Sequence, residues 1–416
     1  MDKRNRIGWM TLLVISIMIS FLGFFMKPLS HAAEPVKIGL LADLSGGFTA
    51  LGQDMKDGFL FYMDKVGYKA AGRNIEVIVE DIGTNDVSKA LDKANKVIQK
   101  DRVDIIAGVI TSGSAYGIAN VIKENKIPFV ISNAGADDLT QRQSNDFIIR
   151  PAFVNSMNSH YLGVWAYKQG FRKAAVLGSD FSGGYEHVGG FCRTFTLSGG
   201  QIIQEIWPPL GTTDFGPYLA NIRRDADAVM VWYSGPDALR FVQQYSEYGL
   251  KKKIPLIGSG GLVDEMILDK QAEAAEGIIT AWHYNYVSDN PENKEFKAAF
   301  FKKFGRKANL YSEEGYASGQ VICEGLKVTK GDAKNGAGFV KAMRSLKMKA
   351  PRGSLKFDKF GGPVQTSYIR KVEKVEGEWQ NVPFTSTPEV SQFWTWSPEE
   401  FMKMPPYVTM KGKWAK

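Results

Sequence analysis

The sequence predicts an α/β protein made of two doubly wound parallel-sheet lobes joined by a multi-strand hinge. Strand-like and helical segments alternate over the first 150 residues, and the same alternation starts again after a short extended segment at Arg150–Pro151. Such alternation is typical of βαβ units, which make the strands parallel and place helices on both faces of the sheet. The chain of 416 residues is also longer than one typical hydrophobic core requires.

Each element is predicted from the spacing of its apolar residues. Short apolar runs indicate buried strands, and apolar residues three and four positions apart indicate helices with one buried face. In the first half we expect strands at 36–44, 74–81, 103–110 and 127–133, and helices at 52–66, 88–100 and 114–124. In the second half we expect strands at 173–180, 200–207, 227–234 and 254–260, and helices at 185–197, 215–224 and 236–248.

The pattern changes after residue 277. A strand at 277–285 is followed by helices at 293–304, 313–327 and 338–346, and then by period-two segments at 355–363 and 366–382 that indicate antiparallel strands. The predicted organisation is a signal peptide at 1–33, a first lobe at 34–150 and 277–349, a second lobe at 151–276 and 350–383, and an aromatic, proline-rich tail at 384–416.

The first 33 residues have the three parts of a secretory signal. Basic residues precede the apolar run Ile7–Met26, and the small residues around Ala32 and Ala33 suit a signal peptidase. The alternative is an uncleaved membrane anchor, because the apolar run is about as long as a spanning helix. Either way we expect the folded part to work in the periplasm.

Composition argues against several other classes of protein. The formal net charge of +8 is spread along the chain, and its densest run, Lys251–Lys253, is typical of a solvated turn rather than of a nucleic-acid surface. Cys192 and Cys323 both look like buried apolar residues, although a disulfide between them stays open. The histidine and cysteine spacing indicates no metal site, and no cofactor-binding motif is present.

The candidate site lies in the turns that follow the strands, because ligands of open α/β sheets bind at the carboxyl ends of strands. The turn with Thr111, Ser112 and Ser114 is the most informative, since small hydroxyls and free N–H groups at a helix start suit a carboxylate. Helix capping is the alternative. No hydrolase motif or phosphate-binding motif appears, so we expect no enzyme, although a hydrolase or lyase using Asp43, Asp180 or His187 stays an alternative.

Three blocks resemble the branched-chain-amino-acid receptor family of type I periplasmic solute-binding proteins, which serve ABC importers. They are IGLLADLSGGFTALGQDMKDGF, AGVITSGSAYGIANVIKENKIPFVISNAGADDLT and RKAAVLGSDFSGGYEHVGGF, and the resemblance covers roughly residues 36–380. It implies hinge closure around a small molecule, an ABC permease as partner, and a monomer. A module that senses the ligand for a membrane signalling protein is an alternative.

The resemblance also implies which residues bind. The family's carboxylate-binding Ser matches Ser112, the next turn contributes at Ala134 and Ala136, and a second-lobe Tyr matches Tyr185 within one residue. The acidic residue that holds a ligand ammonium falls near Gly260, so this chain lacks that carboxylate, and it lacks a hydroxyl at Ala136.

An amino acid is therefore a poorer fit than a carboxylate without an amine, because a buried ammonium needs an anion. Aromatic residues near strand ends further favour a planar ligand, and the chain resembles the family's aromatic-acid-binding branch. We expect an aromatic carboxylate; a branched-chain or other amino acid or amide is the alternative. The predicted ligand-binding residues are Phe48, Thr111, Ser112, Ser114, Asn133, Ala134, Ala136, Tyr185, Tyr233, Ser259, Gly260 and Trp282.

Overall fold

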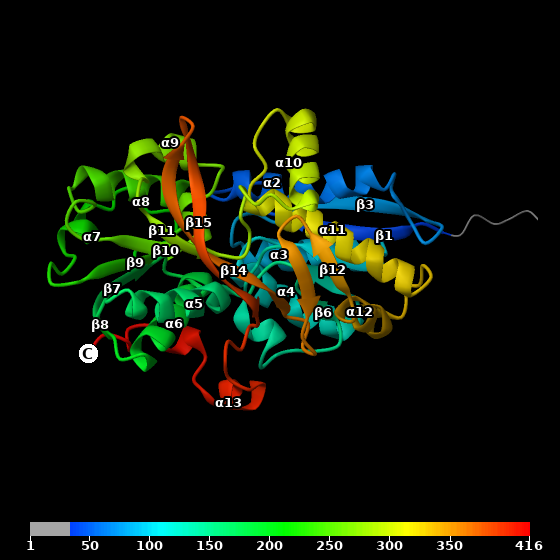
Figure 1. Cartoon of the computed structure of the whole chain (residues 1–416). Helices are drawn as coiled ribbons and strands as arrows, with labels where there is room; N and C mark the ends of the chain where they lie inside the picture. Colours follow the sequence, from blue (N-terminus) through cyan, green and yellow to red (C-terminus); the bar gives the residue numbers. More distant parts are fainter. Residues whose placement is uncertain (1–33) are drawn as a thin grey trace, which may run out of the picture. The chain divides into compact units, whose positions relative to one another are not determined.

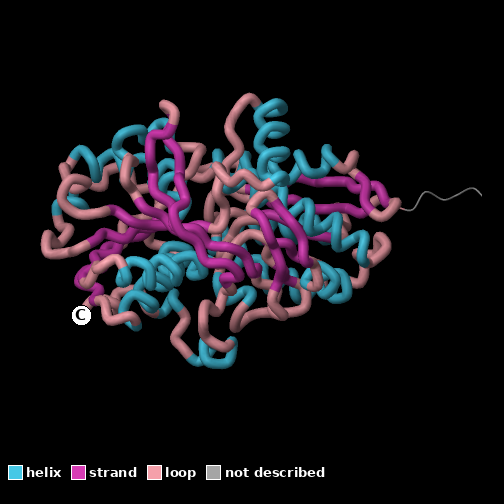
Figure 2. Tube along the Cα trace, viewed as in Figure 1, coloured by secondary structure: helices cyan, strands magenta, loops and turns pink. Residues whose placement is uncertain are grey.

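The structure, a computed structural model, describes residues 34–416, so the predicted signal peptide lies outside the described residues. Val36–Lys416 form one compact unit. Its strands form two sheets, each with helices on both faces (Figures 1 and 2). The predicted fold class is confirmed. Within this described range, no helix is long and apolar enough to span a membrane, and no three or more His, Cys, Asp or Glu side chains are grouped so that they could hold a metal ion.

The first sheet has six strands in the order β2-β3-β1-β4-β5-β6, and every neighbouring pair except β2–β3 is parallel. Helices α2 and α11 pack together on one face, while α3 and α4 cover the other. The strands are β1 (Val36–Ala42), β2 (Lys69–Ala70), β3 (Arg73–Asp81), β4 (Ile105–Gly108), β5 (Phe129–Ile131) and β6 (Ile148–Ile149). The helices of this first lobe are α2 (Thr49–Lys65), α3 (Val87–Gln99), α4 (Ser112–Asn125), α10 (Pro291–Phe304), α11 (Leu310–Val328) and α12 (Gly336–Arg344).

The second sheet has nine strands. Its parallel part is β11-β10-β9-β7-β8, and β14 joins β11 antiparallel and pairs with both β13 and β15. Helices α5 and α6 cover one face, and α8 covers the other. The strands are β7 (Lys173–Gly178), β8 (Gln201–Ile206), β9 (Ala228–Trp232), β10 (Leu256–Ser259), β11 (Ile279–Trp282), β12 (Lys347–Ala350), β13 (Gly353–Phe357), β14 (Pro363–Val375) and β15 (Glu378–Val390). The helices of this second lobe are α5 (Asn155–Lys168), α6 (Ser182–Leu197), α7 (Gly216–Ala220), α8 (Gly235–Glu247) and α9 (Leu268–Gln271).

The chain passes between the two lobes after β6, after β11 and again through β12–β14. β11 pairs in the second sheet, whereas the predicted boundary at residue 277 put this segment in the first lobe. The buried Arg352 ties the crossing segments together, because its Nη1 donates to the carbonyls of Pro151 and Ala152 at 3.0 and 2.9 Å. The guanidinium also pairs with the buried Glu313 of α11.

Helix α5 was not among the predicted elements. Its first six residues, NSMNSH, are mostly polar yet all buried, so the helix shows no apolar face in the sequence. It lies among α6, the second sheet and the tail, and these neighbours supply the polar partners.

The predicted tail is more regular than its composition indicates, because β15 runs on to Val390 and α13 (Pro398–Lys403) follows. Two thiols, Cys192 and Cys323, are buried and free, and they lie in the cores of different lobes.

Candidate functional site

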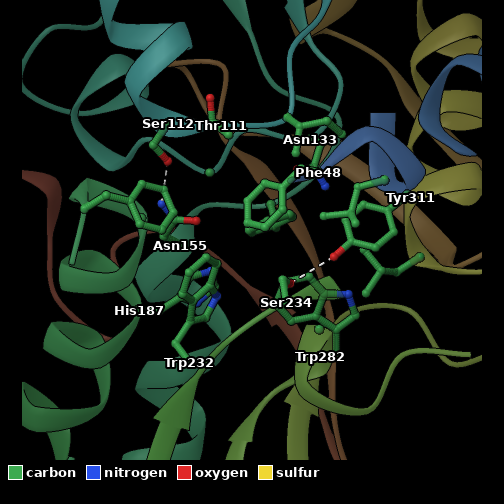
Figure 3. Close-up of a pocket in the computed structure, with 18 residues that line it drawn as sticks. Phe48, Thr111, Ser112, Asn133, Asn155, His187, Trp232, Ser234, Trp282 and Tyr311 are labelled. Atoms are coloured by element: carbon green, nitrogen blue, oxygen red, sulfur yellow. Dashed lines mark hydrogen bonds between the residues drawn. The ribbon is translucent and has the colours of Figure 1, made fainter. Parts of the chain in front are cut away.

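A pocket lies where the turns after β4, β5, β9 and β11 meet the starts of α4 and α6 (Figure 3). Its lining comes from both lobes, and its empty volume is about 450 Å³, open solvent at the mouth included. This is within the usual size of a site for a small molecule. The lining residues are Phe48, Leu51, Ile110, Thr111, Ser112, Asn133, Gly135, Phe153, Asn155, Phe181, Gly183, His187, Trp232, Ser234, Gly261, Trp282, Leu310 and Tyr311.

Hydrogen-bond donors gather at the start of α4. The helix begins at Ser112, two residues before the predicted start, so the first-turn N–H groups lie at the pocket edge. Thr111 donates its hydroxyl to Ser114 Oγ at 2.9 Å, which places Ser114 behind the lining. Asn155 Nδ2 donates to Ser112 Oγ at 3.0 Å. Since Ser112 Oγ already accepts this bond, its own proton is available for an acceptor in the pocket.

A buried carboxyl joins this donor group to the other lobe. Glu186 of α6 accepts from Asn155 Nδ2 at Oε2 over 2.6 Å and from the Tyr116 hydroxyl at Oε1 over 2.7 Å. Burial raises the pKa of the Glu186 carboxyl well above its usual range, and the neighbouring Asp137 raises this pKa further. Tyr116 belongs to α4, so the bond between Tyr116 and Glu186 crosses from the first lobe to the second.

Aromatic rings form much of the remaining wall. Phe153 packs against Trp282 with ring centroids 4.6 Å apart, and His187 stacks on Trp232 at 5.1 Å with 17° between the planes. The hydroxyls of Ser234 and Tyr311 lie 2.9 Å apart at the same edge (Figure 3). Flat rings on several sides suit a planar guest.

The pocket carries no formal charge of its own. Among its described lining residues none is Asp, Glu, Lys or Arg. Two rings of the lining are titratable. Burial lowers the pKa of the His187 imidazole well below its usual value and raises the pKa of the Tyr311 phenol well above its own, so both rings are neutral at physiological pH. A charged ligand group here is therefore stabilised by hydrogen bonds and by helix starts rather than by an ion pair.

Five of the twelve predicted residues line this pocket: Phe48, Thr111, Ser112, Asn133 and Trp282. The Asn133 amide donates to the buried Glu314 carboxyl, which fixes its orientation. The binding role of all twelve stays a prediction, but the structure gives the position of each one relative to the pocket.

The other seven lie behind or outside the lining. Ala134 and Ala136 are buried in the core of the first lobe, and Gly135 between them reaches the pocket. Tyr233 points into the second core, 4.7 Å from the Phe241 ring centroid, while both of its neighbours line the pocket. The remaining predicted residues outside the lining are Ser114, Tyr185, Ser259 and Gly260.

Tyr185 faces away from the pocket, where its hydroxyl donates to Asp180 and its ring lies against Trp207. The reason is helical phase: Gly183 and His187 are four residues apart on one face of α6, and Tyr185 lies on the opposite face. Asp180 also pairs with Lys411 of the tail. Asp43, the other carboxylate weighed for catalysis, accepts from the Ile110 N–H at 3.0 Å.

Gly260 packs against Trp282, and Ser259 is buried outside the lining. A Cβ atom at residue 260 would stand 2.3 Å from Trp282 Cγ, so the indole occupies the space that a side chain there would need. This matters because residue 260 is where the sequence predicted an ammonium-binding acid to be missing.

Several lining residues were not predicted as ligand contacts, among them Phe153, Asn155, Phe181, His187, Ser234 and Tyr311. Asn155 starts α5 soon after the two-residue strand β6, and Tyr311 lies in the first turn of α11, which follows helix α10 rather than a strand. His187 was considered only as a catalytic candidate; its spacing of four from Gly183, at a helix start, is the signal that could have identified it.

Comparison with known proteins gives consistent matches. A family model described as "Periplasmic binding protein" matches residues 35–377. A solute-binding protein of an ABC transporter from Rhodopseudomonas palustris BisB5, solved with 3,4-dihydroxybenzoic acid, is 34% identical; the match covers 86% of this chain and 98% of that one, with a TM-score of 0.81. An ABC transporter substrate-binding protein from Sphaerobacter thermophilus is 32% identical, with coverage of 86% and 99% and a TM-score of 0.82.

Among curated proteins, the "Leu/Ile/Val-binding protein homolog 6" of Brucella melitensis is 29% identical over 350 residues. That match covers 83% of this chain and 89% of the Brucella protein.

Proposed function

This chain belongs to the periplasmic binding protein family, and from that premise we propose that it captures a small aromatic carboxylate between its lobes for an ABC importer. The ligand-loaded, closed form is then the shape that a membrane permease recognises. The proposal includes a monomeric protein in the periplasm, delivered there by a leader at residues 1–33. The family consists of solute receptors, and we propose no catalytic step.

The observation that carries the proposal is the chemical division of the pocket. One edge offers the Ser112 hydroxyl and the free N–H groups at the start of α4, which suit a carboxylate. The rest of the lining is uncharged and rich in aromatic rings. An α-amino acid would bring an ammonium into this space, and a buried ammonium without an anion is strongly unfavourable.

The contact between Gly260 and Trp282 supports the same conclusion. Because an added Cβ at residue 260 would stand 2.3 Å from the indole, Trp282 and an acidic side chain at 260 exclude one another. The chain thus has a flat aromatic wall where a receptor for amino acids would need an anion.

The relatives support two different ligands. The Rhodopseudomonas protein was solved with 3,4-dihydroxybenzoic acid, whereas the Brucella protein is named for leucine, isoleucine and valine. We favour the aromatic acid because the pocket lacks a charged side chain and is lined by aromatic rings. Handing the ligand to a membrane sensor instead of a permease would use the same site.

The proposed mechanism follows from the contacts between the lobes. Ser112 binds the carboxylate in the first lobe, and the second lobe approaches until Glu186 of α6 meets Tyr116 and Asn155 of α5 meets Ser112. The crossing segments held by Arg352 would bend during this closure. Closure removes the ligand from water and strengthens each hydrogen bond to it.

The test is direct binding to the secreted, mature protein after bound ligand has been removed by unfolding and refolding. We expect benzoate- or cinnamate-type acids to raise the melting temperature, since a ligand at 100 times its Kd adds about 2.7 kcal/mol to folding stability. Leucine, isoleucine, valine and their amides serve as competitors. A shift with leucine and none with any aromatic acid would contradict the proposed ligand.

Variants then locate the site. Ser112→Ala is expected to weaken binding of the aromatic acid by roughly 10-fold or more, because a hydrogen bond to a charged group contributes about 1.5–3 kcal/mol. Tyr185→Phe, on a pocket-distant face of α6, is the matched control and should bind as the wild type does. Unchanged binding by Ser112→Ala would remove Ser112 from the site.

A further inference from the structure

His187 differs from the other described histidines in having no hydrogen-bond partner. His160 Nε2 lies 2.6 Å from the Tyr407 hydroxyl, and His283 Nδ1 is hydrogen-bonded to Asn158 Nδ2 at 3.5 Å. His187 is 1% exposed, lines the pocket, and its Nδ1 is buried without a partner in residues 34–416. A buried polar group without a hydrogen-bond partner is unfavourable. A ligand atom in the pocket would supply the hydrogen bond that the protein does not give this imidazole.

The surroundings of His187 are rings. Trp232 stacks on it at 5.1 Å, Phe153 lies at 5.8 Å and Trp282 at 6.0 Å between centroids. These contacts fix the plane of the imidazole, and its burial keeps it neutral, as its lowered pKa indicates. A neutral imidazole has one N–H donor and one acceptor nitrogen.

A second unpartnered donor lies at the same edge. Trp282 Nε1 is buried and, within the described residues, makes no hydrogen bond. Figure 3 shows His187, Trp232, Ser234 and Trp282 along the edge of the pocket opposite Ser112 and Thr111. A ligand carboxylate held at Ser112 would thus direct the far side of its ring toward this uncharged polar edge.

The chemistry of the edge formed by His187 and Trp282 determines which substituent of the ligand ring can bind there. A ring hydroxyl donates and accepts one hydrogen bond each and carries no charge, which matches a neutral imidazole beside an indole N–H. A second carboxylate would bury a second negative charge with no cation among the lining residues, and an amine would lack an anion.

We propose that His187 binds a hydroxyl group on the ring of the captured acid, so that the preferred ligands are hydroxylated aromatic monocarboxylates. The inference rests on the proposed function and narrows it. His187 is thereby a specificity-determining residue, separate from the carboxylate-binding start of α4.

The experiment compares benzoate, 3-hydroxybenzoate, 4-hydroxybenzoate and terephthalate by titration calorimetry on the mature protein. We expect at least one hydroxybenzoate to bind roughly 10-fold or more tightly than benzoate, because a site built for a hydroxyl rejects the analogue that lacks it. Terephthalate should bind more weakly than either. Benzoate binding as tightly as both hydroxybenzoates, or terephthalate binding best, overturns the inference while leaving the aromatic-acid proposal standing.

Two variants isolate the imidazole. His187→Phe keeps a stacked ring without the nitrogens and should abolish the preference for hydroxybenzoate, with benzoate affinity changed less than roughly 3-fold. His187→Asn keeps a donor and an acceptor and should restore part of that preference. Tyr185→Phe on the same helix is the control. Equal loss of affinity for benzoate and hydroxybenzoate in His187→Phe would instead give His187 a general packing role.

A measurement on the unmodified protein covers the case in which the variants fold poorly. The imidazole ¹⁵N resonances of His187 should shift on addition of the hydroxybenzoate and stay near their ligand-free values with benzoate. Identical spectra with the two acids would overturn the inference. Absence of binding by every aromatic acid is the separate outcome that would contradict the proposed function itself.

Discussion

The Tyr116 hydroxyl of the first lobe donates to Glu186 Oε1 of the second lobe over 2.7 Å. Glu186 Oε2 accepts from Asn155, and Asn155 also donates to Ser112 Oγ. One continuous set of hydrogen bonds therefore links the contact between the lobes to the hydroxyl that we propose binds the ligand. We therefore expect closure and ligand binding to be coupled through these four side chains.

Removing the hydroxyl of Tyr116 is expected to speed ligand release. Tyr116→Phe deletes the hydrogen bond to Glu186 across the lobes, and with it the bond that the hydroxyl accepts from the Asp138 N–H inside the first lobe. Because the bond to Glu186 joins the lobes, the dissociation rate should rise roughly 3–10-fold. Stopped-flow fluorescence of the pocket indoles, Trp232 and Trp282, measures this rate. Glu186→Gln should act in the same direction, and combining the two changes should give less than the sum of their effects. Strict additivity would show that the two side chains are not coupled.

Stability should depend on pH through Asp43. Burial raises the pKa of Asp43 from 3.8 to about 7 in the folded protein. Its contribution to folding stability is therefore fully present below pH 3.8 and is lost as the pH rises through about 7, because the unfolded chain ionises first.

Asp43→Asn removes this titration and keeps an oxygen for the Ile110 N–H. The free energy of unfolding of the variant, relative to the wild type, should rise by a few kcal/mol between pH 4 and pH 8, since one pKa unit corresponds to about 1.4 kcal/mol. Chemical denaturation at several pH values checks this. A constant difference across that range would mean that Asp43 has an ordinary pKa.

A methyl group at residue 260 should be destabilising. In Gly260→Ala the new Cβ would stand 2.3 Å from Trp282 Cγ, and relieving such overpacking costs about 1–3 kcal/mol. The displaced indole should also weaken binding of the aromatic ligand. Gly47→Ala is the matched control, because a Cβ there meets no heavy atom within 4 Å and Gly47 lies at an exposed turn. Equal melting temperatures for the two variants would contradict the packing argument.

The tail should be a stabilising part of the second lobe. Tyr407 is buried, its hydroxyl lies 2.6 Å from His160 Nε2, and the Arg193 guanidinium stands 4.0 Å from its ring centroid. Tyr407→Ala is expected to lower the free energy of unfolding by roughly 3–5 kcal/mol. Val408→Ala, at the half-exposed neighbouring residue, should change it little. Thermal or urea unfolding distinguishes this result from a tail that lies loosely on the surface.

Much of the fold could be predicted because the alternation of β1, α2, β3, α3 and their successors is local information. A strand buried on both sides must be apolar along its length, and its covering helices must be apolar on one face. Helix α5 escaped prediction for the opposite reason. Its buried residues are largely polar and satisfied by partners from the second sheet and the tail, and no local pattern reveals partners so distant in sequence.

The site divides in the same way. The sequence by itself determined the turn at Thr111 and Ser112 and the absence of an anion at Gly260, because strand ends and missing side chains are local properties. Only the tertiary structure decided that His187 rather than Tyr185 faces the pocket, because the phase of α6 depends on where that helix starts and how it packs. It alone also placed Asn155 beside Ser112, because this contact joins α5 of the second lobe to α4 of the first and no local pattern reveals how the lobes meet.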